Sequence, residues 1–191
     1  MLALARMPTA PEILVVCTGN ICRSPLGEAA LRARLDGRAR VVSAGTYGQE
    51  GSGATEGSIV AGRELGLDLS AHRARRIRPA DIDAADLVLA MEREHRDLVV
   101  RSVPEARDRT FTLKELVRLA ERAPLLGDLD ARVADAARRR AAAEADGDLD
   151  VADPYGDTLD AYRRIAGEID AWTDRLVVGL FGPALAATGD V

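Results

Sequence analysis

A strand-to-helix junction near the start of the chain limits the possible folds more than any other feature of the sequence. Four consecutive apolar residues, Ile13 to Val16, end abruptly at the polar segment 17–20. Such a β-rich run is typical of a strand buried on both faces. Ser24–Pro25 then provides a capping hydroxyl and a proline for the first helical position, with Glu28 in the first turn. We expect a strand, a loop and a helix within a dozen residues.

The rest of the chain continues this alternation. The segments 41–44, 86–90 and 109–112 predict further strands, and helical patterns follow them. From Leu159 to Leu180, apolar residues recur every three or four positions, which predicts one long helix on the sheet. Alternating strands and helices favour an α/β fold with a parallel sheet wrapped by helices.

Length and charge exclude several classes of protein. A chain of 191 residues predicts one domain, and a net charge of −5 offers no general attraction to nucleic acid. The longest apolar run, at 176–187, is too short to cross a membrane, and the first eleven residues lack the apolar core of a secretory signal. We therefore expect a cytoplasmic protein with no membrane or nucleic-acid partner. Two cysteines and two histidines make a four-ligand zinc site improbable.

Residues 120–152 are rich in Ala, Arg and Asp and show little apolar periodicity. This composition predicts a polar helix at 134–145 on a surface excursion. We interpret the segment as an insertion without chemistry of its own.

The segment from Cys17 to Arg23 has the features expected of a catalytic anion-binding loop. A thiol and a guanidinium are separated by five residues just before a helix start, the C-x5-R arrangement of thiol phosphatases. Five residues are about enough to wrap the backbone round one tetrahedral oxyanion, where N–H groups and the helix dipole add positive charge. Arg23 would hold two phosphate oxygens, and the same field would stabilise Cys17 as the nucleophilic thiolate.

The C-x5-R spacing alone carries little weight, because with 25 arginines in 191 residues about one cysteine in eight has such an arginine by chance. The context strengthens it: a buried strand precedes the loop, Gly19 lets the backbone approach an anion, and Pro25 follows in the helix. The structural alternative is an inert turn with two small buried thiols, Cys17 and Cys22.

The sequence from Val16 to Pro25, VCTGNICRSP, resembles the active-site signature of the low-molecular-weight protein tyrosine phosphatase family. The resemblance extends to segments 43–45, 70–72, 86–91 and 153–156, and only 120–152 is longer than the family's usual length. It implies a single domain over 1–191 with a three-layer sandwich fold. A four-stranded parallel sheet is flanked by helices, and the phosphatase loop joins the first strand to the first helix.

The resemblance also implies catalytic roles for three residues. Cys17 is the nucleophile, Arg23 binds the phosphate in the transition state, and Asp153 is the general acid. The leaving atom needs a proton as its bond to phosphorus breaks, and Pro154 restricts the backbone that carries Asp153. No metal or cofactor is expected, because Arg23 and the loop amides supply the positive field.

The expected partner is a phosphorylated protein, with phosphate or another oxyanion in the loop. The implied substrate-binding residues are Thr18, Gly19, Asn20, Ile21, Cys22, Ser24, Tyr47 and Tyr155.

A hydrogen-bond network behind the loop is also implied by the resemblance. Its members are Asn20, Ser24, Ser43 and His72. A lone histidine is more often structural than catalytic, so His72 is assigned a supporting role and His95 none. Cys22 has two open interpretations: a packed core thiol, or a thiol that captures oxidised Cys17 in a disulfide.

Thr18 distinguishes two substrate classes. Phosphotyrosine members commonly have a bulky apolar residue at this position, whereas the bacterial protein-arginine phosphatases of the family resemble this chain there and at 110–115. A β-branched hydroxyl side chain narrows the pocket and offers a hydrogen bond to a guanidinium, while an aryl ring prefers an apolar wall. We expect phosphotyrosine hydrolysis, with phosphoarginine as the alternative. Tyr47 and Tyr155 would line the rim and can stack on either group.

Two other function classes are compatible with the loop. An arsenate reductase would use further thiols to resolve the adduct on Cys17, but the chain has no third cysteine for an internal relay. A non-catalytic anion-binding module would keep the loop without needing Asp153. The presence of Asp153–Pro154 argues against that module.

Overall fold

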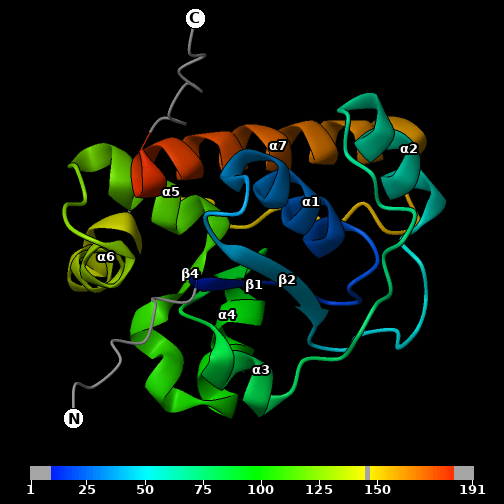
Figure 1. Cartoon of the computed structure of the whole chain (residues 1–191). Coiled ribbons are helices and arrows are strands. Elements are labelled where there is room, and N and C mark those ends of the chain that lie inside the picture. Colours follow the sequence, from blue (N-terminus) through cyan, green and yellow to red (C-terminus); the bar gives the residue numbers. More distant parts are fainter. Residues whose placement is uncertain (1–9, 145–146, 183–191) are drawn as a thin grey trace, which may run out of the picture.

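The structure, a computed structural model, describes residues 10–144 and 147–182, and within them four parallel strands form one sheet (Figure 1). The strand order is β2-β1-β3-β4, and every neighbouring pair is parallel. All four predicted strands are confirmed. Their bounds are Glu12–Cys17 for β1, Arg40–Gly45 for β2, Leu87–Ala90 for β3 and Thr110–Thr112 for β4.

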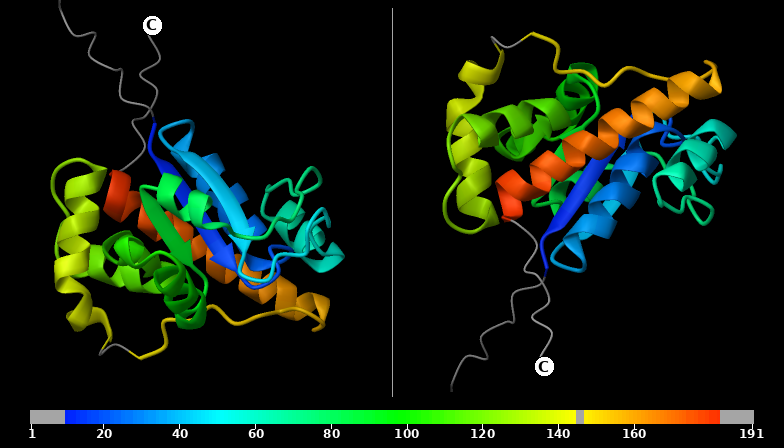
Figure 2. Two further views of the ribbon diagram at one scale, coloured as in Figure 1. Left: turned by 90° about the horizontal axis from the view of Figure 1, so that it is seen from below. Right: turned by 90° about the horizontal axis from the view of Figure 1, so that it is seen from above.

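Helices cover both faces of the sheet, so the predicted three-layer sandwich is confirmed (Figure 2). On one face α1 (Arg23–Leu35) and α5 (Leu113–Arg122) pack against α7 (Leu159–Phe181), the predicted long helix. Successive β1 side chains enter opposite cores: Ile13 and Val15 the larger one, Leu14 and Val16 the smaller. The remaining elements are α2 (Glu56–Glu64), α3 (Pro79–Ala84), α4 (Arg93–Ser102), the 3₁₀ helix η1 (Pro104–Arg109) and α6 (Leu129–Glu144).

The prediction of the first helix start was wrong in detail. Helix α1 begins at Arg23 with Cys22 at the N-cap, no side chain caps it, and its first turn contains no acidic residue. The Ser24 hydroxyl contacts Cys17 and Asn20 instead of a backbone N–H of α1. Helix α1 therefore starts without a side-chain cap, and the Ser24 hydroxyl lies behind the loop.

Helix α6 differs from the polar surface helix that the sequence predicted over 134–145, whose last residue lies outside the described residues. It spans Leu129–Glu144, and Val133 and Ala136 are buried against the core. Arg140 reaches the fully buried Glu115 and lies 4.4 Å above the ring of Phe111. Arginine stems and alanines cover apolar surface here, so the helix packs without the Leu and Ile pattern that would have revealed it.

The topology places the Cys17–Arg23 segment at the carboxyl end of β1. Strand β1 pairs with β2 on one side and β3 on the other, so chain connections diverge at this point of the sheet. Ligands of open α/β sheets bind in the crevice at such a divergence. The loop 18–22 between β1 and α1 lies at this edge.

Candidate active site

One cavity of about 260 Å³ opens at the end of β1. It brings together residues from the loop after β1, from the segment after β2 and from the segment before α7, which are far apart in the sequence. Nine residues predicted for the site line it, together with Gln49, which the sequence analysis did not single out. The lining residues are Cys17, Thr18, Gly19, Ile21, Cys22, Arg23, Tyr47, Gln49, Asp153 and Tyr155.

The loop backbone is fixed by close contacts with the segment after β2. Asn20 has a φ of 56°, in the left-handed region that asparagine tolerates better than most residues. Thr46 N–H donates to the carbonyl of Cys17, and Tyr47 N–H donates to that of Thr18, both at 2.9 Å. A Cβ on Gly45 would lie 2.5 Å from the Thr18 carbonyl oxygen, so only glycine permits this approach.

Cys17 is buried and lines the cavity, and its Sγ lies 3.0 Å from the Ser24 hydroxyl. A thiolate is the better nucleophile and a good hydrogen-bond acceptor. The Ser24 O–H is therefore positioned to donate to the thiolate form of Cys17. Both cysteines of the chain are free thiols.

Arg23 is almost fully buried, and several groups hold its guanidinium. Nη1 donates to the carbonyl of Val151 at 2.9 Å and lies 3.1 Å from Glu92. Nη2 lies 2.7 Å from an Asp153 carboxylate oxygen and 3.3 Å from the Thr18 hydroxyl. Its Nε is buried and has no hydrogen-bond partner among the described residues. A buried donor without a partner is uncommon, and an anion in the cavity would supply one.

Asp153 lies at the open side of the same cavity. One carboxylate oxygen accepts from Arg23, while the other accepts from the backbone N–H of Tyr155 at 3.1 Å. Its side chain is 41% exposed, in contrast to the buried Arg23. The carboxyl group is thus held over the cavity yet stays accessible to a substrate and to water.

The predicted supporting network exists behind the loop. Asn20 Nδ2 donates to the hydroxyls of Ser24 and Ser43, at 2.9 and 2.8 Å, and His72 Nε2 donates to the Asn20 carbonyl at 2.7 Å. Asn20 Oδ1 accepts from the backbone N–H of Arg75. Asn20 and Ser24 were also predicted to bind substrate, but both side chains are fully buried and do not line the cavity.

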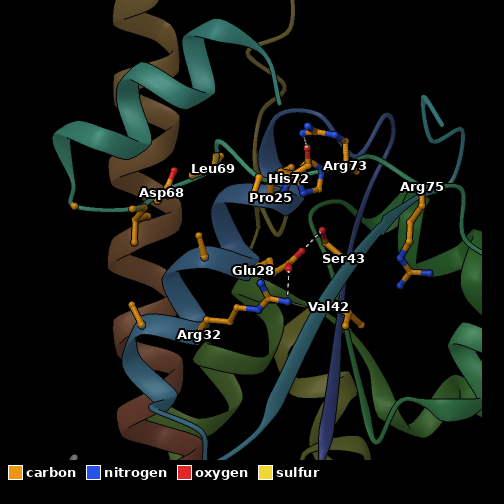
Figure 3. Close-up of a pocket in the computed structure, with 15 residues that line it drawn as sticks. Pro25, Glu28, Arg32, Val42, Ser43, Asp68, Leu69, His72, Arg73 and Arg75 are labelled. Carbon is orange, nitrogen blue, oxygen red and sulfur yellow. Dashed lines mark hydrogen bonds and ion pairs between the residues drawn. The ribbon is translucent and has the colours of Figure 1, made fainter. Parts of the chain in front are cut away.

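The network extends to a carboxylate on α1. Ser43 Oγ donates to Glu28, which forms an ion pair with Arg32 at 2.8 Å (Figure 3). These groups line a separate cavity of about 440 Å³ on the other side of the loop, together with His72. Hydrogen bonds therefore connect Glu28 through Ser43, Asn20 and Ser24 to Cys17.

His95 on α4 and Glu92, the N-cap of α4, contact residues of the site, and neither was assigned from the sequence. His95 is buried, and its Nε2 lies 2.9 Å from the Thr18 hydroxyl and 3.3 Å from Glu92. Burial, reinforced by the charge of Arg23, lowers the pKa of His95 to about 4, so the imidazole is neutral at pH 7. His95 follows β3 by only a few residues, and that position is the one sequence signal that could have found it.

Cys22 lines the cavity, but it is almost fully buried and two hydroxyl groups contact its thiol. Its Sγ is 3.4 Å from the Thr55 hydroxyl and 3.8 Å from that of Tyr162. Burial raises the pKa of the Cys22 thiol above its usual value. These contacts fit the packed-thiol interpretation, and the redox role remains a hypothesis.

The two predicted rim tyrosines frame the cavity opening. Tyr47 and Tyr155 are each about three-fifths exposed.

Among residues 10–144 and 147–182, no cluster of three or more His, Cys, Asp or Glu side chains is arranged to hold a metal ion. The same residues contain no helix long and apolar enough to cross a membrane.

The chain is similar to known proteins in sequence and in fold. The family model described as low molecular weight phosphotyrosine protein phosphatase matches residues 12–128. A protein-arginine-phosphatase from Geobacillus stearothermophilus is 36% identical over 86% of this chain and 93% of its own. The low molecular weight protein-tyrosine-phosphatase Etp of Escherichia coli K12 is 32% identical over 86% and 94%. The crystal structure of the Erwinia amylovora tyrosine phosphatase AmsI superposes with a TM-score of 0.71 at 28% identity, covering 94% and 97% of the two chains.

Proposed function

Because the chain belongs to the low-molecular-weight protein tyrosine phosphatase family, we propose that it hydrolyses phosphotyrosine in proteins through a thiophosphate on Cys17. One observation carries the proposal: Cys17, Arg23 and Asp153 line the same cavity. The family membership makes the chain a protein phosphatase, and the individual roles below are our assignment.

In the first step, the Cys17 thiolate attacks phosphorus. The S–P bond forms as the bond from phosphorus to the tyrosine oxygen breaks, and Asp153 donates its proton to that oxygen. The buried Nε of Arg23, with Nη2, offers the two parallel donors that a phosphate dianion accepts. Phosphate binding would then replace the Arg23–Asp153 contact and leave Asp153 free to carry its proton.

In the second step, water attacks the thiophosphate. Asp153, now a carboxylate, takes a proton from the water, and the S–P bond breaks to release phosphate and the Cys17 thiolate. The Ser24 hydroxyl, 3.0 Å from Sγ, stabilises the thiolate as leaving group. Arg23 and the loop backbone supply the positive field, so the proposed cycle uses no metal or cofactor.

A second candidate is protein-arginine phosphatase activity, and Thr18 is the observation that favours it. Its side chain lines the cavity, and its hydroxyl lies 2.9 Å from His95 Nε2 and 3.3 Å from Arg23 Nη2. A guanidinium leaving group gains more than an aryl ring from a hydroxyl at the cavity wall. The 36% identical relative from Geobacillus stearothermophilus carries the name protein-arginine-phosphatase.

Phosphate release from matched phosphotyrosine and phosphoarginine peptides tests the proposal directly. We expect turnover of the phosphotyrosine peptide without added metal, and the ratio of the two kcat/KM values decides between the candidates. No turnover of either peptide by folded protein would contradict both.

Two further assignments belong to this proposal. They are one phosphatase domain for the chain, with 120–152 as an insertion, and a cytoplasmic location. The end of this insertion contacts the site, because the Val151 carbonyl accepts from Arg23. The segment thereby contributes to the site although its helix carries no catalytic group.

A further inference from the structure

A cavity of about 300 Å³ lies where α4, η1 and α6 meet, and it shares no lining residue with the catalytic cavity. Its lining is strongly basic, because it contains four arginines and one acidic residue. The chain as a whole has a net charge of −5, so this excess of positive charge is local. Positive charge concentrated in a cavity attracts anions. The lining residues are Arg96, Asp97, Val100, Arg101, Arg107 and Arg140.

Ion pairs fix the inner wall of this basic cavity. Glu115 is fully buried, and its carboxylate lies 3.3 Å from Arg96 Nη1 and 3.0 Å from Arg140 Nε. Asp97 also pairs with Arg96, at 3.2 Å. Arg140 Nη1 donates to the carbonyl of Arg107 at 3.0 Å, which ties α6 to η1. Both of these carboxylates are therefore engaged by Arg96 and Arg140.

Arg101 and Arg107 differ from the two inner arginines. Both are exposed, and among the side chains that the structure describes their guanidiniums have no hydrogen bond or ion pair. Arginine is abundant in this chain, but other exposed guanidiniums have acidic partners, as Arg175 has Glu121 at 2.7 Å. The positive charge that no carboxylate offsets therefore lies at the mouth of the basic cavity.

The arginines of the basic cavity also repel one another. Burial lowers the pKa of Arg140 below its usual value. The charges of Arg96 and Arg107 lower it further, and those of Glu115 and Asp108 raise it. A guanidinium nevertheless stays charged at neutral pH. An anion in the cavity would offset this repulsion.

We propose that the basic cavity binds a phosphate-type oxyanion, which the guanidiniums of Arg101 and Arg107 hold in the positive field of Arg96 and Arg140. A guanidinium presents two parallel N–H donors that match two oxygens of such an anion. The site is separate from the catalytic one and does not depend on the reaction proposed for Cys17. Two sources carry this chemistry: free inorganic phosphate, and a second phosphorylated residue of a protein substrate.

Helix α4 connects the basic cavity with the catalytic site. Its N-cap, Glu92, pairs with Arg23 at 3.1 Å. Arg96 and Arg101 follow Glu92 in the chain, about 6 and about 14 Å further along the helix axis. Four extended residues span about 14 Å, so a second phosphorylated residue about four to eight positions from the first spans the two sites.

Inorganic phosphate is the first probe of the basic cavity. Arginine Nε–H signals of the ¹⁵N-labelled protein are followed by NMR while phosphate replaces chloride at constant ionic strength. We expect saturable shifts of the Arg101 and Arg107 signals, with a midpoint different from that of the loop amides at 18–22. The affinity should fall as the ionic strength is raised.

A double variant and a matched control localise the binding. Arg101→Gln/Arg107→Gln replaces two exposed side chains, so the fold should persist, and phosphate affinity read from the Arg140 signal should fall by about tenfold or more. Arg63→Gln/Arg164→Gln makes the same change in charge at exposed positions of α2 and α7 outside the basic cavity. It should bind phosphate like the wild type. Chemical denaturation checks that both variants are folded.

Phosphotyrosine peptides distinguish the two sources. The peptides carry a second phosphoserine from two to eight residues before or after the phosphotyrosine, and calorimetry measures their binding to Cys17→Ser. A gain of about tenfold at one spacing, lost when Arg101→Gln/Arg107→Gln is added, identifies a second phosphate of the substrate as the occupant. Saturable phosphate shifts without such a gain identify free phosphate.

The proposal fails if neither probe depends on the basic cavity. No saturable phosphate shift together with no gain at any spacing would overturn it, and so would binding that Arg101→Gln/Arg107→Gln leaves unchanged. An equal gain from glutamate in place of phosphoserine would also overturn it, because the surface would then bind acidic segments in general. Absence of turnover would contradict the proposed function alone, since the phosphate titration does not require Cys17 to react.

Discussion

The two sides of the catalytic loop differ in how completely their polar groups are satisfied. On the cavity side, Arg23 Nε lacks a hydrogen-bond partner within the part of the chain that the structure describes, and Asp153 remains partly exposed. On the opposite side, Asn20 makes hydrogen bonds with both its amide nitrogen and its amide oxygen. The polar groups on the cavity side can therefore still bind a ligand, whereas the side chain of Asn20 on the opposite side already has its hydrogen-bond partners within the protein.

This difference separates function from stability within a single loop. Groups that await a ligand contribute to turnover but little to folding, whereas a closed network of buried hydrogen bonds stabilises the loop and only indirectly affects the reaction. Substitutions on the cavity side should therefore reduce activity at unchanged stability. Substitutions on the network side should reduce both.

Cys17→Ser provides the largest expected effect. A serine hydroxyl is a far weaker nucleophile than a thiolate, so turnover of an aryl phosphate should fall by about 10⁴-fold or more. The free energy of unfolding should change by less than about 1 kcal/mol. Phosphate-release assays measure the turnover, and chemical denaturation measures the free energy of unfolding. Cys22→Ser is the matched control and should lose much less activity. Near-native activity in Cys17→Ser would rule out the thiophosphate.

Asp153→Ala should depend on the leaving group. Poor leaving groups require the proton of Asp153, so their kcat should fall by about 10²- to 10⁴-fold, while good leaving groups lose much less. Glu92→Gln is the control, because Glu92 also pairs with Arg23 but does not line the cavity. Its losses should be equal for both leaving groups. Equal losses in Asp153→Ala would assign Asp153 a structural role.

The parts of the molecule that the sequence could predict are those that short, local patterns determine. Strand β1 and the C-x5-R spacing are local patterns, so the fold class and the pair Cys17 and Arg23 were accessible from short segments. Asp153 required a family resemblance, because no local pattern singles it out among the acidic residues. Contacts across the fold, such as His95 with Thr18, join residues 77 positions apart and depend on the packing of α4.

Asn20→Ala should test the network side. It removes two donated hydrogen bonds and one accepted one, and places alanine in the left-handed region. We expect a loss of about 3 to 5 kcal/mol in the free energy of unfolding, with activity reduced in parallel. Asn20→Gly relieves the backbone strain but not the lost bonds, so it should recover about 1 kcal/mol. Native stability in Asn20→Ala would contradict the proposed division of the loop.

His95 contacts Thr18 on the cavity side, and its protonation predicts an effect on acid stability. The pKa is about 4 in the folded chain and about 6.5 when unfolded, so the unfolded state binds more protons between these values. Stability is therefore lost as the pH falls from about 6.5 to about 4, by about 3 kcal/mol from this group. His95→Gln removes the contribution, and its unfolding free energy should decline less over this range. Identical pH profiles for wild type and His95→Gln would contradict the prediction.

Thr18→Leu gives the smallest effect and the sharpest test of the cavity wall. Leucine removes the hydroxyl that contacts His95 and Arg23 and makes the wall apolar. The ratio of kcat/KM for phosphotyrosine to that for phosphoarginine should rise by about 10- to 100-fold, which corresponds to about 1 to 3 kcal/mol for one pocket contact.

Thr18→Val separates the two properties that Thr18→Leu changes together, because valine keeps the shape of threonine and lacks only the hydroxyl. If the hydroxyl discriminates, Thr18→Val should reproduce most of the shift towards phosphotyrosine. If pocket width discriminates, only Thr18→Leu should show it. Both variants are measured at one pH with the same pair of peptides, since a phosphoramidate nitrogen is more basic than a phenolic oxygen and its hydrolysis depends on Asp153 over a different pH range. An unchanged ratio in both variants would show that Thr18 has no influence on substrate choice. The Thr18 hydroxyl would then no longer support phosphoarginine as the substrate.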